Sequence, residues 1–209
     1  MAGKGTAELC VSGRDARNDA GEVYAVLAFV KSAVLIERDG VLNQVRLVRQ
    51  LPHAPQSAEE FQVHPYAAEL LAKLRAAGLL IIVTTNQPGL SRGTLLRRDL
   101  DRMHEVLRRT LPVNDVLVCP HDEMDHCPCR KPRAGLLTEA AHTWRFDLVR
   151  SYVVSDKWQD AEASREANCT SVLLESPWLG NGHHDFIVSD LGAAVGKILQ
   201  LETTPPVLA

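Results

Sequence analysis

Short apolar runs alternate along the chain with segments whose apolar residues recur at helical spacing. The runs predict buried strands at 33–36, 79–83, 115–119, 152–154, 171–174 and 186–188. The segments between them predict helices at 65–78, 94–110, 134–144, 158–167 and 190–201. Continuous apolar strands separated by helices indicate an α/β protein with a parallel sheet covered on both faces. Residues 44–63 have no clear period and predict a surface excursion.

The same pattern divides the 209 residues into one domain and two flanking segments. We expect residues 1–30 to be a disordered leader, although the apolar segment 23–30 has no assigned place. The domain is expected at 31–201 and a tail at 202–209. The apolar runs are far shorter than the ~20 residues of a membrane-spanning helix, and the first 21 residues lack the apolar core of a signal peptide. We therefore expect a cytoplasmic protein with no membrane contact. We also expect a monomer.

Composition and charge exclude two further classes of protein. Hydrophobic residues make up 45% of the chain and charged residues 23%, which is the balance of an ordinary globular domain and excludes a wholly disordered chain. The net charge is −3, so nucleic-acid binding through bulk positive charge is not expected.

Cysteine spacing predicts a metal site. Three of the five cysteines fall within eleven residues, in a segment that also carries a histidine, and the ligand set is Cys119, His121, Cys127 and Cys129. Three thiolates and one imidazole form a closed tetrahedral set that suits structural Zn²⁺. His126 is interpreted as a bystander.

Two alternatives to a structural zinc loop are compatible with these residues. The first is a reduced cysteine-rich loop without metal. The second is a zinc-ribbon module for nucleic acid, which the acidic segment 122–126 argues against. Cys10 and Cys169 are interpreted as ordinary thiols.

Polar residues follow several of the predicted strands. They are Asp39, Thr85, Asn86 and Asp156, and Lys131 follows the zinc loop. Ligand sites in parallel sheets lie beyond the carboxyl ends of the strands, and Mg²⁺ binds carboxylates together with substrate phosphate. The set therefore predicts a phosphoryl site. Each residue alone is also compatible with a turn, a helix cap or a solvated side chain.

Four stretches carry a family resemblance. They are 37–43, against an Asp-Arg-Asp-Gly motif; 83–89, against Thr-Asn-Gln; 119–132, with the zinc ligands; and 154–160, against Gly-Asp-x-x-x-Asp. From about 33 to 201 the chain resembles the haloacid dehalogenase (HAD) superfamily, and within it the small zinc-loop phosphatases of heptose 1,7-bisphosphate and of histidinol phosphate. The resemblance implies a HAD-like three-layer α/β/α domain with a parallel central sheet, a zinc-binding loop and no large cap domain.

The resemblance also implies roles for individual residues. Glu37 stands at the nucleophile position, Asp39 is the general acid and base, and Thr85 and Lys131 hold the transferring phosphoryl group. The implied Mg²⁺ ligands are Glu37, Asp39 and Asp156, with Asp160 in support. The residues implied to bind a small phosphorylated metabolite are Arg38, Asn86, Gln87, Arg130 and Lys157.

Two positions depart from the family pattern. Glu37 stands where the family has Asp, and Ser155 where it has Gly. The additional methylene extends the reach of the carboxylate by roughly 1 Å, a misplacement that can cost about 100-fold in rate. Glu37 is therefore a slow nucleophile, a repositioned nucleophile or only a metal ligand. Loss of turnover would leave a phosphosugar-binding protein without activity.

The substrate signals conflict. The five-residue gap between His121 and Cys127 resembles the histidinol-phosphate type, whereas Gly40–Asn43 resembles the heptose type, which is our first expectation. Arg46, Arg49 and His53 either meet a second anionic group or form a solvated face. The loop 176–185 either borders the site or is a surface turn.

Overall fold

The computed structural model describes residues 16–17, 23–24, 31–180 and 182–203. In the segment 1–30, β1 (Ala16–Arg17) pairs antiparallel with β2 (Val23–Tyr24). The rest of the expected leader lies outside the described residues, as do residues 204–209 of the expected tail. The segment that starts at Lys31 forms a separate compact unit.

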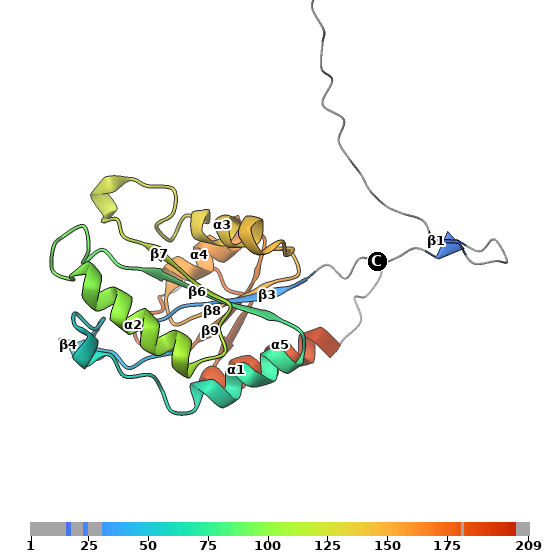
Figure 1. Cartoon of the computed structure of the whole chain (residues 1–209), viewed down its shortest axis with the longest axis horizontal. Helices are drawn as coiled ribbons and strands as arrows, with labels where there is room; N and C mark the ends of the chain where they lie inside the picture. The colour runs from blue at the N-terminus through green and yellow to red at the C-terminus, as the bar shows by residue number, and fades with distance from the viewer. Residues whose placement is uncertain (1–15, 18–22, 25–30, 181, 204–209) are drawn as a thin grey trace, which may run out of the picture. The chain divides into compact units, whose positions relative to one another are not determined.

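One parallel sheet organises this unit (Figure 1). Its order is β10-β9-β8-β3-β6-β7. The strands are β3 (Ala33–Ile36), β6 (Leu80–Asn86), β7 (Asp115–Cys119), β8 (Tyr152–Ser155), β9 (Thr170–Leu174) and β10 (Phe186–Val188). Ile36 at the end of β3 lies beside Val83 of β6 and Val154 of β8, so the carboxyl ends of these three strands meet.

Helices cover both faces of the sheet, which confirms the expected three layers (Figure 1). One face carries α1 (Ala67–Ala76), α2 (Arg97–Thr110) and α5 (Leu191–Thr203). The other carries α3 (Gly135–Trp144) and α4 (Trp158–Glu166).

The packing of strand β3 on both faces of the sheet explains why residues 33–36 are all apolar. Val34 and Ile36 pack into the core beneath α1, α2 and α5, whereas Ala33 and Leu35 pack beneath α3 and α4. Successive side chains of a strand point to opposite faces, so a strand covered on both sides must be apolar at every position.

The surface excursion contains structure that the sequence pattern did not predict. Strands β4 (Arg46–Val48) and β5 (Leu51–His53) form a hairpin, and a 3₁₀ helix, η1, follows at Ala58–Glu60. The hairpin turns at Arg49 and Gln50, both with positive φ. A second 3₁₀ helix, η2 (Glu123–Asp125), lies in the zinc-loop segment.

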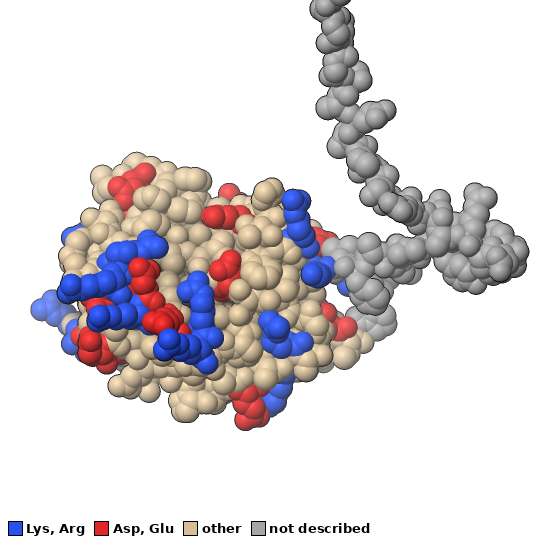
Figure 2. Space-filling model, viewed as in Figure 1, with Lys and Arg blue, Asp and Glu red and all other residues tan. Residues whose placement is uncertain are grey.

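Charged side chains of both signs are interspersed on the surface over α2 (Figure 2). Arg97 pairs with Asp101, and Arg109 with Glu105, one helical turn apart. In the part of the chain that the structure describes, none of the helices has both the length and the apolar character that a membrane crossing needs.

Candidate active site

Side chains from three neighbouring strands and one loop meet at the carboxyl edge of the sheet. Glu37 and Asp39 follow β3, Thr85 ends β6, and Asp156 follows β8. Lys131 arrives from the loop that follows β7. All five residues are buried, although four of the five carry charge. Buried charges require close partners, so the contacts of each one define the site.

The carboxylate of Glu37 is held from both sides. Its Oε1 accepts hydrogen bonds from Thr85 Oγ1 at 3.0 Å and from the backbone N–H groups of Arg38 and Asp39 at 3.0 and 3.2 Å. Its Oε2 accepts from Lys131 Nζ at 2.5 Å. Burial alone would raise the pKa of Glu37, but the ammonium groups of Lys131 and Lys157 outweigh it and lower the pKa to about 2. Glu37 is therefore ionised at neutral pH.

Lys131 is a fixed positive charge. Its Nζ also donates to Asp160 Oδ1 at 2.5 Å and to the main-chain oxygen of Thr84 at 2.8 Å. Burial disfavours the charged form, yet Asp160 and Glu37 raise the pKa of Lys131. Asn86 fixes the backbone of Lys131 through two hydrogen bonds, one to its carbonyl oxygen and one from its N–H.

Asp39 is oriented by Arg38 and Gln87. Arg38 binds both carboxylate oxygens, with Nε to Oδ1 at 3.0 Å and Nη2 to Oδ2 at 2.9 Å, and Gln87 Nε2 donates to Oδ2 at 2.7 Å. The guanidinium is fully buried, lies over the ring of Phe61 and contacts His104 Nε2 at 3.0 Å. Burial, with Arg38 next, lowers the pKa of His104 to about 3, so its ring is neutral and accepts this hydrogen bond.

The expectation that Arg38 binds substrate stays a prediction, and the structure directs its guanidinium away from the cleft. Its guanidinium lies behind Asp39, and its hydrogen bonds go to Asp39 and His104. Arg38 therefore positions the candidate general acid and does not line the cleft.

Asp156 is fixed by the loop 176–185, which the sequence analysis left open as either a border of the site or a surface turn. Trp178 Nε1 donates to Asp156 Oδ2 at 3.0 Å, and Ser176 Oγ donates to the main-chain oxygen of Asp156 at 2.8 Å. The other carboxylate oxygen, Oδ1, accepts from Lys157 Nζ at 2.7 Å. The only available signal for Trp178 was its position after β9, which lies beside β8.

Gly40 lies against Asp156 and must be glycine for two reasons. Its φ is +94°, a conformation that costs other residues energy, and a Cβ there would stand 2.6 Å from Asp156 Oδ2. The glycine of the first motif therefore allows the loop after β3 to pack onto the carboxylate that follows β8.

The acidic residues fit a magnesium ion. The available donors are the carboxylates of Glu37, Asp156 and Asp160 and the main-chain oxygen of Asp39, which are the hard oxygen ligands that Mg²⁺ prefers. Asp160 Oδ2 is buried and has no hydrogen-bond partner among the described residues. Burial, which the charge of Glu37 reinforces, raises the pKa of Asp160 to about 6.

The four predicted zinc ligands come together. The ligand atoms of Cys119, His121, Cys127 and Cys129 all lie within 4.8 Å of one another. The sulfur–sulfur distances from Cys127 are 3.6 and 3.5 Å, and Cys129 Sγ lies 3.3 Å from His121 Nδ1. A tetrahedral site with Zn–S bonds of 2.3 Å places its sulfur atoms about 3.8 Å apart, so the cluster fits Zn²⁺. His126 lies outside the cluster, as expected.

The zinc loop is anchored to the loop after β6. Arg92 binds both carboxylate oxygens of Asp122, and Ser91 Oγ donates to Asp125 Oδ2 at 3.0 Å. Lys131 stands only two residues after Cys129. The cluster therefore lies next in sequence to a residue that contacts Glu37.

A cleft of about 410 Å³ opens over these residues. The predicted site residues that line it are Glu37, Asp39, Asn86, Gln87, Arg130, Lys157 and Asp160. Thr85 and Lys131 are buried beneath Glu37 and do not line it.

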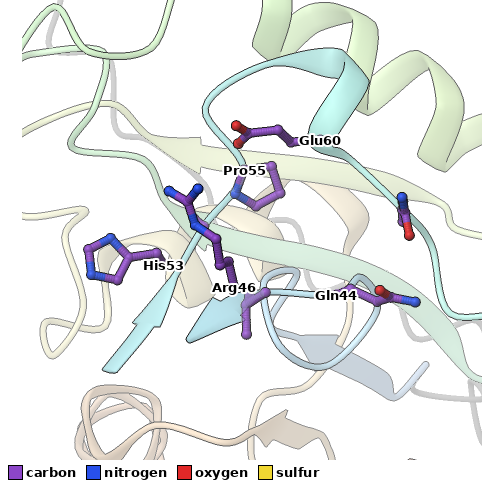
Figure 3. Close-up of a pocket in the computed structure, with 8 residues that line it drawn as sticks. Gln44, Arg46, His53, Pro55 and Glu60 are labelled. Atoms are coloured by element: carbon purple, nitrogen blue, oxygen red, sulfur yellow. The ribbon is translucent and has the colours of Figure 1, made fainter. Parts of the chain in front are cut away.

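A second hollow, of about 280 Å³, lies beside the hairpin (Figure 3). Arg46 extends into it between His53 on one side and Pro55 and Glu60 on the other. His53 lines both hollows, so they adjoin. Arg49 lies at the turn of the hairpin and lines neither.

The fold and the site define a class of protein, the hydrolases that transfer phosphoryl groups to a carboxylate at the end of a parallel strand. A HAD-hydrolase-like family model matches residues 128–193. A D-glycero-β-D-manno-heptose-1,7-bisphosphate 7-phosphatase of Pseudomonas aeruginosa is 30% identical over 184 residues, which cover 81% of this chain and 99% of that protein. The chain belongs to this HAD-like phosphatase family.

Solved structures agree with this assignment. The heptose 1,7-bisphosphate phosphatase of Bordetella bronchiseptica, complexed with magnesium and phosphate, superposes with a TM-score of 0.67 and 29% identity, and covers 82% of this chain and 99% of its own. A putative HAD-like phosphatase of Mesorhizobium loti gives a TM-score of 0.66 at 26% identity, with coverage of 83% and 86%.

Proposed function

We propose that this chain is a phosphoric monoester hydrolase that removes one phosphate from a small phosphorylated sugar, with D-glycero-D-manno-heptose 1,7-bisphosphate as the first candidate. One observation carries the proposal: an ionised carboxylate, Glu37, stands at the end of β3 between the hydroxyl of Thr85 and the ammonium of Lys131. The relatives that match four fifths of the chain bear the name of this activity.

The chemistry takes two steps. An oxygen of Glu37 attacks phosphorus while the bond from phosphorus to the sugar oxygen breaks, and Asp39 gives its proton to that leaving oxygen. Water then attacks the phosphorus of the acyl phosphate and passes a proton to Asp39. Inorganic phosphate leaves, and the carboxylate of Glu37 is restored.

Neighbouring residues stabilise the charge that develops on the phosphoryl oxygens. Lys131 and Thr85 each donate to one oxygen of the Glu37 carboxylate, so both are placed to meet the transferring group. Magnesium, when bound by Glu37, Asp156 and the main-chain oxygen of Asp39, with Asp160 in support, neutralises further negative charge. Arg130 and Lys157 line the cleft and are proposed to orient the remainder of the substrate.

The location and assembly of the protein belong to the same proposal. Zinc bound by three thiolates is compatible with a reducing compartment, which supports a cytoplasmic location. We further propose that residues 31–201 act as a monomer on a small phosphorylated metabolite, without nucleic acid or membrane.

Two alternatives compete with this function. Histidinol phosphate is the alternative substrate, supported by the short interval between His121 and Cys127. A phosphosugar-binding protein without turnover is the alternative of another class, supported by glutamate at position 37. Arg46 and His53 beside the cleft favour a substrate with two anionic groups.

Phosphate release in the presence of Mg²⁺ separates these functions. The substrates are heptose 1,7-bisphosphate, histidinol phosphate and several sugar monophosphates, and the proteins are wild type, Glu37→Asp and Glu37→Gln. We expect wild type to hydrolyse the heptose bisphosphate. The rate of Glu37→Asp should differ from it by up to about 100-fold, and Glu37→Gln should show no turnover. If only Glu37→Asp released phosphate, the wild-type protein would be a phosphosugar-binding protein without turnover.

A further inference from the structure

The side chain of Lys157 turns into the acidic cluster instead of outward to water. Lys157 follows Asp156 directly and is the residue before α4. Its Nζ instead donates to the main-chain oxygen of Asp39 at 2.5 Å and to Asp156 Oδ1 at 2.7 Å. Its side chain is 25% exposed. Ordering a lysine side chain loses rotamer freedom, so these contacts must offset that loss.

The two oxygens that Lys157 contacts belong to the donor set described above for magnesium. Mg²⁺ requires oxygen ligands at 2.0–2.1 Å. A point that close to both oxygens lies within a few ångström of the Lys157 ammonium, where two cations repel each other strongly at the low dielectric of a buried site. The ammonium and the magnesium ion therefore compete for the same position.

The charge of the cluster also favours a single additional cation at this position. Without Lys157, the four carboxylates of Glu37, Asp39, Asp156 and Asp160 would face only two cations, those of Arg38 and Lys131. Arg38 and Lys131 are fully engaged with other partners. Lys157 borders the cleft, so its ammonium group has open space to move into.

We propose that Lys157 is an internal cation that holds the magnesium position of the free protein, so that Mg²⁺ enters by displacing its ammonium group into the cleft. The inference rests on the proposed function for the identity of the metal, and concerns binding only.

Displacement couples magnesium to anions. An ammonium group released into the cleft has lost two oxygen partners, and a phosphate there supplies new ones. Whatever favours the displaced lysine therefore favours magnesium, and the two ligands strengthen each other by the same factor. Free Mg²⁺ should bind weakly, and phosphate should tighten its binding.

Calorimetric titration of Mg²⁺ tests the proposal without turnover. The proteins are wild type, Lys157→Met, which keeps the length of the stem without the charge, and Lys157→Gln, which keeps a donor. Lys73→Met is the matched control, because Lys73 is exposed on α1 and pairs with Glu69, outside the cleft, and its loss changes the net charge equally. Each titration is done with and without inorganic phosphate at fixed ionic strength.

We expect Lys157→Met to bind Mg²⁺ at least tenfold more tightly than wild type, Lys157→Gln to fall between them, and Lys73→Met to match wild type. Phosphate should tighten Mg²⁺ binding in wild type and much less in Lys157→Met. If Lys157→Met does not fold without metal, Lys157→Gln decides. Equal or weaker Mg²⁺ binding in both Lys157 variants would overturn the proposal. Tight Mg²⁺ binding in the variants, with no hydrolysis by wild type, would overturn the proposed function and leave this inference standing.

Discussion

At the scale of single residues, the site is a chain of buried charges that fix one another. Lys131 joins Glu37 to Asp160, and Arg38 joins Asp39 to His104. Removing one member leaves its partner charged and unpaired in the interior, which typically costs about 3–5 kcal/mol. These residues therefore serve stability as well as chemistry.

The depressed pKa of Glu37 predicts an acid-sensitive contribution to stability. Its pKa falls from 4.5 to about 2 on folding, so the contribution is present above pH 4.5 and is lost as the pH falls through about 2. The full contribution is on the order of 3 kcal/mol. Urea unfolding of wild type and Glu37→Gln between pH 2 and 7 measures it. A difference in unfolding free energy that did not change below pH 4.5 would contradict the prediction.

The hydrogen bond from Trp178 to Asp156 predicts that Trp178 positions a magnesium ligand. Trp178→Phe keeps the aromatic ring but leaves Asp156 Oδ2 without its donor. Loss of such an outer partner typically costs about 10–100-fold in metal affinity. We expect a rise of about tenfold in the Mg²⁺ concentration that gives half-maximal activity, with little change in thermal midpoint. Trp144→Phe is the control, because its indole bonds Asp115 on β7, and a rise of the same size there would count against the role.

At the scale of elements, the apolar runs predicted every strand of the parallel sheet, because burial on both faces leaves a strong signal. The ends of the strands were less predictable. Strand β6 continues through Thr84, Thr85 and Asn86, which look like a polar exit but pair with β7. The hairpin escaped prediction because Leu47 and Leu51 are exposed and carry no burial pattern.

In the candidate site, residues in local motifs were predictable, and contacts between residues far apart in the sequence were not. Residues in local motifs, such as Glu37, Asp39 and the zinc ligands, could be predicted because short spacing alone brings them together. Trp178 acts on a residue 22 positions away, and the inward direction of Arg38 depends on His104, 66 positions away. Neither contact leaves a trace in local sequence.

The zinc loop predicts that a structural metal supports catalysis. Removal of Zn²⁺ by a chelator frees the four ligands, and Arg130 and Lys131 follow the last of them directly. We expect loss of activity and faster proteolysis between residues 119 and 133, with recovery on addition of Zn²⁺ but not of Mg²⁺. Cys127→Ala should reproduce the defect. An intact loop in protein shown by mass spectrometry to be free of zinc would exclude the role.

At the scale of the whole molecule, the described part of the chain carries no large domain over the cleft. The hairpin and the loops at the edge of the sheet are the elements that border it. An open cleft of this size suits a compact substrate.

Replacement of residues 46–53 by a short Gly-Ser turn tests the contribution of the hairpin. The hairpin residues are largely exposed, so we expect the thermal midpoint to change by only a few degrees. Loss of Arg46 and His53 should raise KM for a sugar bisphosphate more than for the matching monophosphate. Arg49→Gln is the control, since Arg49 lines neither hollow. An equal rise in KM for both substrates would exclude recognition of a second anion.

The contact between Gly40 and Asp156 limits which sequences this fold can accept. Position 37 holds an acid one methylene longer than the family pattern, and its carboxylate still reaches the Thr85 hydroxyl and the Lys131 ammonium. Position 40 offers no such freedom, since any side chain meets Asp156. A saturation library should therefore recover both acidic residues at 37 and glycine alone at 40. For a designer who wishes to change the chemistry of this scaffold, the acid at position 37 is adjustable and the residue three places later is not.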